Sequence, residues 1–206
     1  VDADFSSKII LSDEAHFHLD GFVNRQNCRV WDSENPRVIS ETNASITVSC
    51  GFWAGGIIGL YFLVAGQAAT VNGAQRDMIT QFFLPKLDNI DVTNMWFQQD
   101  DAIQPIQLEL MREIFPGRVL SRFGDQNWPP RSCDLIPLDF FLWGYLKSKI
   151  YVNNPTTTCA LQEEIKRCIN EIQLQLCRKI MKNFDERVHM CQQSRGGHLP
   201  DVLFHK

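Results

Sequence analysis

Three aspartates of this sequence stand beside strand-like segments and could act together. Asp13 follows the β-rich run 9–11, Asp100 follows the apolar stretch "MWFQQ", and Asp139 follows "IPL" where a helix is predicted to begin. Ligands of α/β sheets gather outside strand ends, so residues distant in sequence can converge there. Converging carboxylates repel one another unless a cation lies between them, and hard oxygen ligands suit Mg²⁺ or Mn²⁺.

Two such ions, about 3.5–4 Å apart, could activate a water or hydroxyl and stabilise the leaving oxygen of a phosphodiester. The spacing has a second explanation, because an aspartate after a strand is often a turn or cap residue. The chain has 24 acidic side chains, which give many accidental triplets. Spacing alone therefore leaves a metal triad and three unrelated turn residues both open.

The first half of the chain predicts mainly strands. Two runs of β-branched and aromatic residues flank "AGG", which predicts a hairpin with its turn at 54–56. Met78, Ile79, Phe82 and Phe83 recur at helical spacing. The "MWFQQ" strand, a helix from about Pro105 to Ile114 closed by "FPG", and the short strand "RVLSRF" follow.

The second half predicts helices. Pro137 suits the first turn of one helix, and Thr158 suits the cap of the next. The last long helix is expected at roughly 176–193, stopped by Gly196 or Gly197 in a left-handed conformation. Strands, then alternating strand and helix, then helices indicate an α/β fold with one domain over residues 1–206.

Composition limits the classes of function. The hydrophobic content of 44% argues for a folded core, and the net charge of -4 excludes a basic nucleic-acid binder without excluding a nucleic-acid enzyme. The seven cysteines lack zinc-site spacing, so we expect reduced, mostly buried thiols. No signal peptide opens the chain, and glycines interrupt its longest apolar stretch, so no membrane association is expected.

Longer motifs add a family resemblance. The segments "SDEAHFHLDG", "WFQQDDA" and "WPPRSCDLIPLDFFLWGYLKSKIYVNNP" together resemble the transposases of the mariner-like superfamily. The ending "HLPDVLFHK" is similar to the C-terminus of some insect members. The resemblance covers nearly the whole chain with its motifs in the family's order.

The resemblance implies a ribonuclease H-like catalytic core, with a mixed central sheet flanked by helices and a helical C-terminal part. By this similarity, Asp13, Asp100 and Asp139 form an Asp-Asp-Asp triad that binds two Mg²⁺ (or Mn²⁺) ions, with 38 residues between the second and third acids. The implied activity is metal-dependent cleavage of transposon-end DNA followed by strand transfer, that is, DNA transposition and integration. The resemblance also implies a nuclear location and a possible homodimer. It further implies N-terminal helix-turn-helix modules, which are not visible in residues 1–206.

The loop before the third acid offers candidate DNA contacts. Trp128 and the two prolines after it form a stiff segment that could meet the DNA backbone. Arg122 and Arg131 could contact phosphates there, although surface arginines need no such function. The basic residues of the last two predicted helices are mixed with acids and indicate a solvated face.

Three positions depart from the family pattern. Asp101 stands where a small residue usually follows the second acid, and Cys133 stands where a proline usually stiffens the loop before the third. The stretch "AIQPIQ" lacks the histidine that often follows the second acid. A catalytically inactive or co-opted remnant that binds DNA or protein is therefore an alternative. A nuclease acting on RNA–DNA hybrids is a further one.

Neighbours of the acids have simpler explanations. Glu14 points to the opposite face from Asp13 if the strand continues, and His16 and His18 share one face of it. We expect the histidines to be solvent-facing or hydrogen-bonded. Trp143 and the pair 140–141 are expected to be core residues of their helix.

Overall fold

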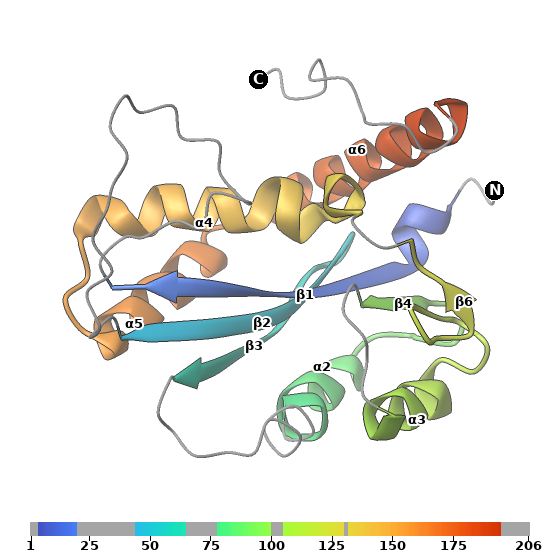
Figure 1. Ribbon diagram of the computed structural model, residues 1–206, viewed down its shortest axis with the longest axis horizontal. Coiled ribbons are helices and arrows are strands. Elements are labelled where there is room, and N and C mark those ends of the chain that lie inside the picture. The colour runs from blue at the N-terminus through green and yellow to red at the C-terminus, as the bar shows by residue number, and fades with distance from the viewer. Residues whose placement is uncertain (1–3, 20–43, 65–77, 100–104, 130–131, 195–206) are drawn as a thin grey trace.

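A mixed six-stranded sheet lies at the centre of the molecule (Figure 1). The computed structural model describes residues 4–19, 44–64, 78–99, 105–129 and 132–194. The strand order is β3-β2-β1-β4-β5-β6; β1, β2 and β3 pair antiparallel, and β1, β4, β5 and β6 pair parallel. The strands are β1 (Ile9–His18), β2 (Ser45–Trp53), β3 (Gly56–Val64), β4 (Trp96–Gln99), β5 (Val119–Ser121) and β6 (Gln126–Asn127).

Strands β2 and β3 form the predicted hairpin. Trp53 pairs with Gly56 across the turn, and Gly56 has a φ of 128°, a conformation that glycine adopts without the steric cost of a Cβ. The turn at 54–56 is therefore confirmed. The described part of the longest apolar stretch, up to Val64, therefore lies in a sheet.

Asp13 does not end its strand, so that prediction was wrong. β1 continues for five further residues, to His18, because β2 pairs with it along this length, from Leu11↔Phe52 to His18↔Ser45. The parallel pairing between β1 and β4, in contrast, ends at Ser12↔Gln99. Asp13 is thus the first residue of β1 that lies beyond the described pairing with β4.

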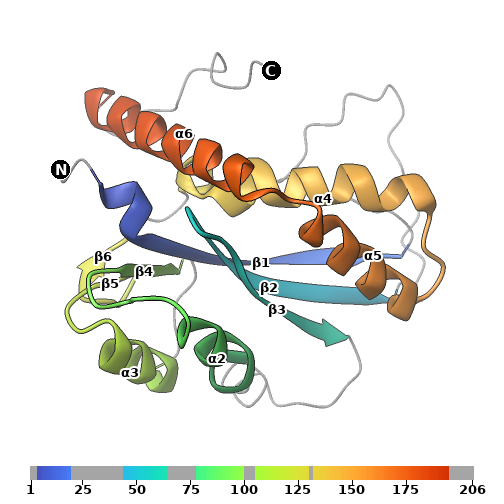
Figure 2. The same ribbon diagram turned by 180° about the vertical axis from the view of Figure 1, so that it is seen from behind.

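Helices cover both faces of the sheet (Figures 1 and 2). One face packs against α4 (Trp143–Ile150), α5 (Thr158–Asn170) and α6 (Leu174–Gln193), with the wide turn η4 (Leu138–Leu142) leading into α4. The other packs against α2 (Leu84–Leu87) and α3 (Pro105–Ile114), with η2 (Met78–Phe83) before α2. Short turns complete the order: η1 (Phe5–Lys8), η3 (Cys133–Leu135) and η5 (Tyr151–Asn153).

The side chains of β1 alternate between two cores. Leu11, Ala15 and Phe17 are buried among the residues of α4, α5 and α6. Ile10 is buried on the other side, among residues of α2, α3 and β5. By this alternation Asp13 shares the face of Leu11, and Glu14 lies on the opposite face, as expected.

Most helix predictions are confirmed, with small shifts at their ends. α3 has the predicted bounds, whereas α6 begins at Leu174, slightly earlier than expected. The cap of α5 is Thr157 instead of Thr158, because the Thr157 hydroxyl accepts the N–H of Ala160 at 3.1 Å. Gly196 and Gly197 lie outside the described residues.

Burial of the cysteines is mixed. Cys50, Cys168 and Cys177 are buried, but Cys133 and Cys159 are exposed, so the prediction of mostly buried thiols was only partly right. Within the described ranges, no helix is long and apolar enough to cross a membrane.

Candidate active site

The carboxylate of Asp13 is held by a buried tryptophan. The indole Nε1 of Trp143 donates a hydrogen bond to Asp13 Oδ2 at 2.7 Å. The Trp143 ring is fully buried and packs edge-on against Phe17, with centroids 6.2 Å apart and an interplanar angle of 74°. Because packing fixes the indole, its N–H is a preorganised donor that orients the carboxylate.

Asp139 lies one helical turn before this tryptophan. It belongs to η4, and Trp143 is the fourth residue after it, so the two lie on neighbouring parts of the same helical surface. Pro137 lies at the start of the turn, in agreement with its predicted first-turn position, and the N–H groups of Asp139 and Phe140 both donate to the carbonyl of Ile136 at 3.0 Å. The helical surface that carries Asp139 therefore also carries the residue that binds Asp13.

The second predicted acid follows β4 directly. Ser12 of β1 pairs with Gln99 of β4, and Asp13 and Asp100 are the next residues of their respective segments. Gln98 is fully buried and Gln99 nearly so, which fixes this end of the strand. Asp100, Asp101 and the following "AIQ" lie outside the described residues, so their predicted roles stay predictions.

A buried thiol lies beside Asp13 on the neighbouring strand. Cys50 of β2 is the register partner of Asp13. Burial first, and the negative charge of Asp13 second, raise the pKa of the Cys50 thiol well above its usual range. Cys50 consequently stays neutral and adds no negative charge beside the carboxylate.

The loop before Asp139 is well formed despite its unusual cysteine. Cys133 is exposed, at the start of η3, and the turn closes with the N–H of Leu135 on the carbonyl of Ser132 at 2.8 Å. The N–H of Ile136 donates to the carbonyl of Cys133 at 3.3 Å. The missing proline therefore leaves the turn intact in the folded state.

The predicted DNA-contact residues have different surroundings. Arg122 is exposed, with its guanidinium 5.3 Å from the centroid of the Phe123 ring. Trp128 is half-buried and packs against the core on the side of α4. Arg131 lies outside the described residues. Contact with DNA stays a prediction for all three.

The remaining polar neighbours agree with their simple explanations. His16 is exposed, and its Nδ1 lies 2.8 Å from Thr47 Oγ1 on the adjacent strand. The basic residues predicted to form a solvated face are exposed: Lys166, Arg167, Arg178, Lys179 and Lys182.

Sequence reasoning missed two polar contributions. Trp143 was expected only in the core, yet it also binds Asp13, and its four-residue spacing from Asp139 was the available signal. Arg187 of α6 was not singled out; it is buried beside the segment that carries Asp139. The available signal was its spacing, because Arg187 continues the buried helical face of Cys177, Met181 and Phe184.

The donor set is suited to a hard divalent cation. Asp13 and Asp139 present oxygen atoms, and the indole bond engages one oxygen of Asp13. Across the described residues, no group of three His, Cys, Asp or Glu side chains is close enough to hold a metal ion. Asp100 is not among those residues.

Comparison with known proteins agrees with this fold and these motifs. No family model matches the chain. It is 26% identical over 199 residues to the Tc3 transposase of Caenorhabditis elegans, covering 92% of this chain and 57% of that protein.

Solved structures of the Mos1 transposase have the same fold. The pre-cleavage Mos1 transpososome superposes with a TM-score of 0.72 at 12% identity, over 96% of this chain and 58% of that chain. The catalytic domain of Mos1 mariner transposase superposes with a TM-score of 0.68 at 15% identity, over 96% of this chain and 87% of that one.

The fold is therefore the ribonuclease H-like fold that the catalytic domain of Mos1 transposase also has, with the expected mixed sheet and helical C-terminal part. The resemblance to the mariner-like superfamily, which the three sequence motifs indicated, is confirmed. The chain spans 57% of the length of its Tc3 relative.

Proposed function

We propose that this chain supplies the catalytic chemistry of DNA transposition: metal-dependent cleavage at transposon ends, followed by transfer of the freed 3′ end to target DNA. The observation that carries the proposal is the 2.7 Å bond from Trp143 to Asp13, because it brings the first predicted acid to the helical surface that bears the third. The solved relatives include a Mos1 strand transfer complex and a paired-end complex with the left transposon end.

In this proposal Asp13, Asp100 and Asp139 hold two Mg²⁺ or Mn²⁺ ions. Mos1 paired-end complexes have been solved with Mn and with Mg. Bound ions of this kind lower the pKa of a water or hydroxyl and stabilise charge on the leaving oxygen of a phosphodiester. The protein therefore needs no separate general base at the scissile phosphate.

The residues of the chain orient the carboxylates. Trp143 donates to Asp13 Oδ2 and so fixes the orientation of the carboxylate. The carbonyl of Ile136 fixes the backbone here by accepting the N–H groups of Asp139 and Phe140. The indole is fully buried, so its N–H donates from a region of low dielectric, where a hydrogen bond is stronger than in water.

DNA is the proposed partner, contacted by Arg122, Arg131 and Trp128 beside the third acid. Pairing of transposon ends favours action as a homodimer in the nucleus. The helix-turn-helix region that the resemblance implies would belong to the part of the full-length protein outside residues 1–206.

An inactive remnant that binds DNA or protein is the second candidate. The observation that favours it is the sequence around the second acid, where Asp101 adds a carboxylate beside Asp100. Like charges placed side by side raise the free energy of the ionised pair and would disturb metal geometry. The intact turn around Cys133 favours the active enzyme.

The test compares Mn²⁺ binding by calorimetry with nicking of supercoiled plasmid. The variants are Asp13→Asn, Asp100→Asn and Asp139→Asn, with Asp88→Asn, at the exposed end of α2, as the matched control. We expect each triad variant to lose both binding and nicking while Asp88→Asn keeps them. Absence of Mn²⁺ binding by the unmodified chain would favour the remnant.

A further inference from the structure

Arg187 is a buried arginine whose described contacts include the segment that carries Asp139. Only 2% of its surface is exposed. From α6 its Nη1 donates to the carbonyl of Asp134 at 2.8 Å, and its guanidinium carbon lies 4.0 Å from the centroid of the Phe140 ring. Its Nε donates to Asn183 Oδ1 at 2.7 Å. The guanidinium therefore fixes the chain on both sides of Pro137.

Burying this cation has a free-energy cost. Burial lowers the pKa of Arg187, and the charge of Asp134 opposes that shift. A well-packed apolar side chain of similar volume would fill the same space without the cost of desolvation. The hydrogen bond of Arg187 to Asp134 and its cation–π contact with Phe140 thus indicate that Arg187 positions this segment in addition to packing against it.

A second contact joins the same helix to the strand of the first acid. Asp185 Oδ2 accepts a hydrogen bond from Ser6 Oγ at 2.5 Å. Ser6 belongs to η1, which leads directly into β1, and both views show α6 passing beside η1 (Figures 1 and 2). Two residues of one helical turn therefore bind the segments that carry Asp13 and Asp139.

We propose that Arg187 is a positioning residue that, through Asp134 and Phe140, sets Asp139 at the separation from Asp13 that a metal site requires. The inference rests on the proposed function in one respect, namely that these acids are metal ligands. Helix α6 holds Arg187 in place relative to the first acid, because the hydrogen bond between Ser6 and Asp185 fixes α6 to the turn that leads into β1.

A packing role alone makes a different prediction. If Arg187 only fills space, its replacement lowers the stability of the whole domain and affects all slowly exchanging amides alike. If it positions Asp139, the segment around η4 loosens selectively. Amide hydrogen exchange separates the two, because the Asp139 and Phe140 amides can be compared with that of Phe17 in β1.

The experiment uses Arg187→Met, Arg187→Lys and the control Arg178→Met at an exposed position of α6. In Arg187→Met we expect exchange of the Asp139 and Phe140 amides to accelerate at least about tenfold relative to Phe17. Mn²⁺ affinity should fall roughly tenfold, as for other residues that orient metal ligands. Arg187→Lys should recover part of both effects, because it keeps a cation over Phe140.

Two results would overturn the positioning role: equal acceleration at Phe17, or unchanged exchange at Asp139 and Phe140. If Arg187→Met does not fold, Phe140→Leu removes the stacked ring while the hydrogen bonds of Arg187 remain, and the same selective exchange is expected. An unmodified chain that binds no Mn²⁺ would overturn the proposed metal site. The exchange ratio would still decide whether Arg187 holds the segment.

Discussion

The hydroxyl of Tyr151 and the backbone of His18 exchange two hydrogen bonds. Tyr151 Oη accepts the N–H of His18 at 3.1 Å and donates to its carbonyl at 2.8 Å. One side chain after α4 thus satisfies both backbone groups at the end of β1. This end of the strand is the one remote from the pairing with β4.

Tyr151→Phe should therefore lower the free energy of unfolding by about 1–3 kcal/mol, since each hydrogen bond contributes roughly 0.5–1.5 kcal/mol. Urea denaturation measures the change. Tyr145→Phe, one turn and a half earlier on the same helical segment, is the matched control. Equal stability of Tyr151→Phe and the unmodified chain would show that water replaces the hydroxyl at His18.

Trp143→Phe should weaken the candidate metal site while keeping an aromatic ring in the core. Loss of the indole donor removes a hydrogen bond to a carboxylate, which contributes roughly 1.5–3 kcal/mol. We expect Mn²⁺ affinity, measured by calorimetry, to fall roughly tenfold because Asp13 is no longer oriented. Trp96→Phe, at a half-buried tryptophan of β4, should leave the affinity unchanged. An equal fall in both variants would argue against the role of the indole bond.

The cysteines should separate into two classes toward iodoacetamide. Cys133 and Cys159 are exposed and should react with the folded protein. Cys50 should react only after unfolding, since it is buried and burial together with Asp13 raises the pKa of its thiol. Peptide mass spectrometry after timed alkylation measures the order. Early labelling of Cys50 would mean that β1 and β2 separate readily.

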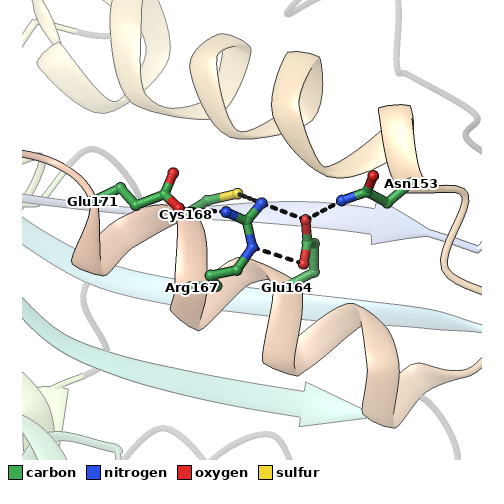
Figure 3. Close-up of polar contacts among 5 residues, drawn as sticks. All are labelled: Asn153, Glu164, Arg167, Cys168 and Glu171. Carbon is green, nitrogen blue, oxygen red and sulfur yellow. Dashed lines mark hydrogen bonds and ion pairs between the residues drawn. The ribbon is translucent and has the colours of Figure 1, made fainter.

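Glu164 should contribute to the pH dependence of stability. Arg167 first, and Asn153 second, lower the pKa of its carboxyl through hydrogen bonds (Figure 3). Because its pKa is lower in the folded state, ionised Glu164 stabilises the fold at pH values above its unfolded-state pKa of about 4.3. This stabilisation is lost as the pH falls through the folded-state pKa.

Glu164→Gln should therefore reduce the loss of stability on acidification below about pH 4.3. Urea midpoints measured at several acidic pH values report it, with the exposed neighbour Glu163→Gln as control. The difference should be small and should shrink at high salt, because Glu164 and Arg167 lie at the surface. A steeper loss in Glu164→Gln would contradict the direction of the shift.

Much of the fold could be predicted from local pattern. The hairpin turn at 54–56 and the bounds of α3 follow from glycine and proline positions and from apolar spacing. The end of β1 was placed too early because Ser12, Asp13 and Glu14 interrupt its apolar run; the alternation of Ala15 and Phe17 with histidines is a strand pattern, and pairing with β2 holds this second half. The cap of α5 shifted by one residue because either of the adjacent threonines could supply the hydroxyl oxygen that accepts a backbone N–H.

The candidate site divides in the same way. Motif similarity identified Asp13 and Asp139, and the structure places them on β1 and η4. The spacing of Trp143 from Asp139 indicated a shared helical surface, but the bonds of Trp143 to Asp13 and of Arg187 to Asp134 join segments far apart in sequence and could not be predicted. Spacing within one helix cannot indicate which distant backbone carbonyl a buried arginine will reach.

The contact between Ser6 and Asp185 has a consequence for biosynthesis. These residues are 179 positions apart. The ribosome therefore synthesises η1 and β1, which carries Asp13, long before it synthesises α6, to which η1 is bonded. Parallel pairing of β1 with β4 also waits for a long intervening stretch. The β1–β3 meander can form early, but the contacts that the proposed positioning role of Arg187 requires can form only after α6 has left the exit tunnel. A growing polypeptide can therefore complete the proposed metal site only after residues 174–193 have been synthesised.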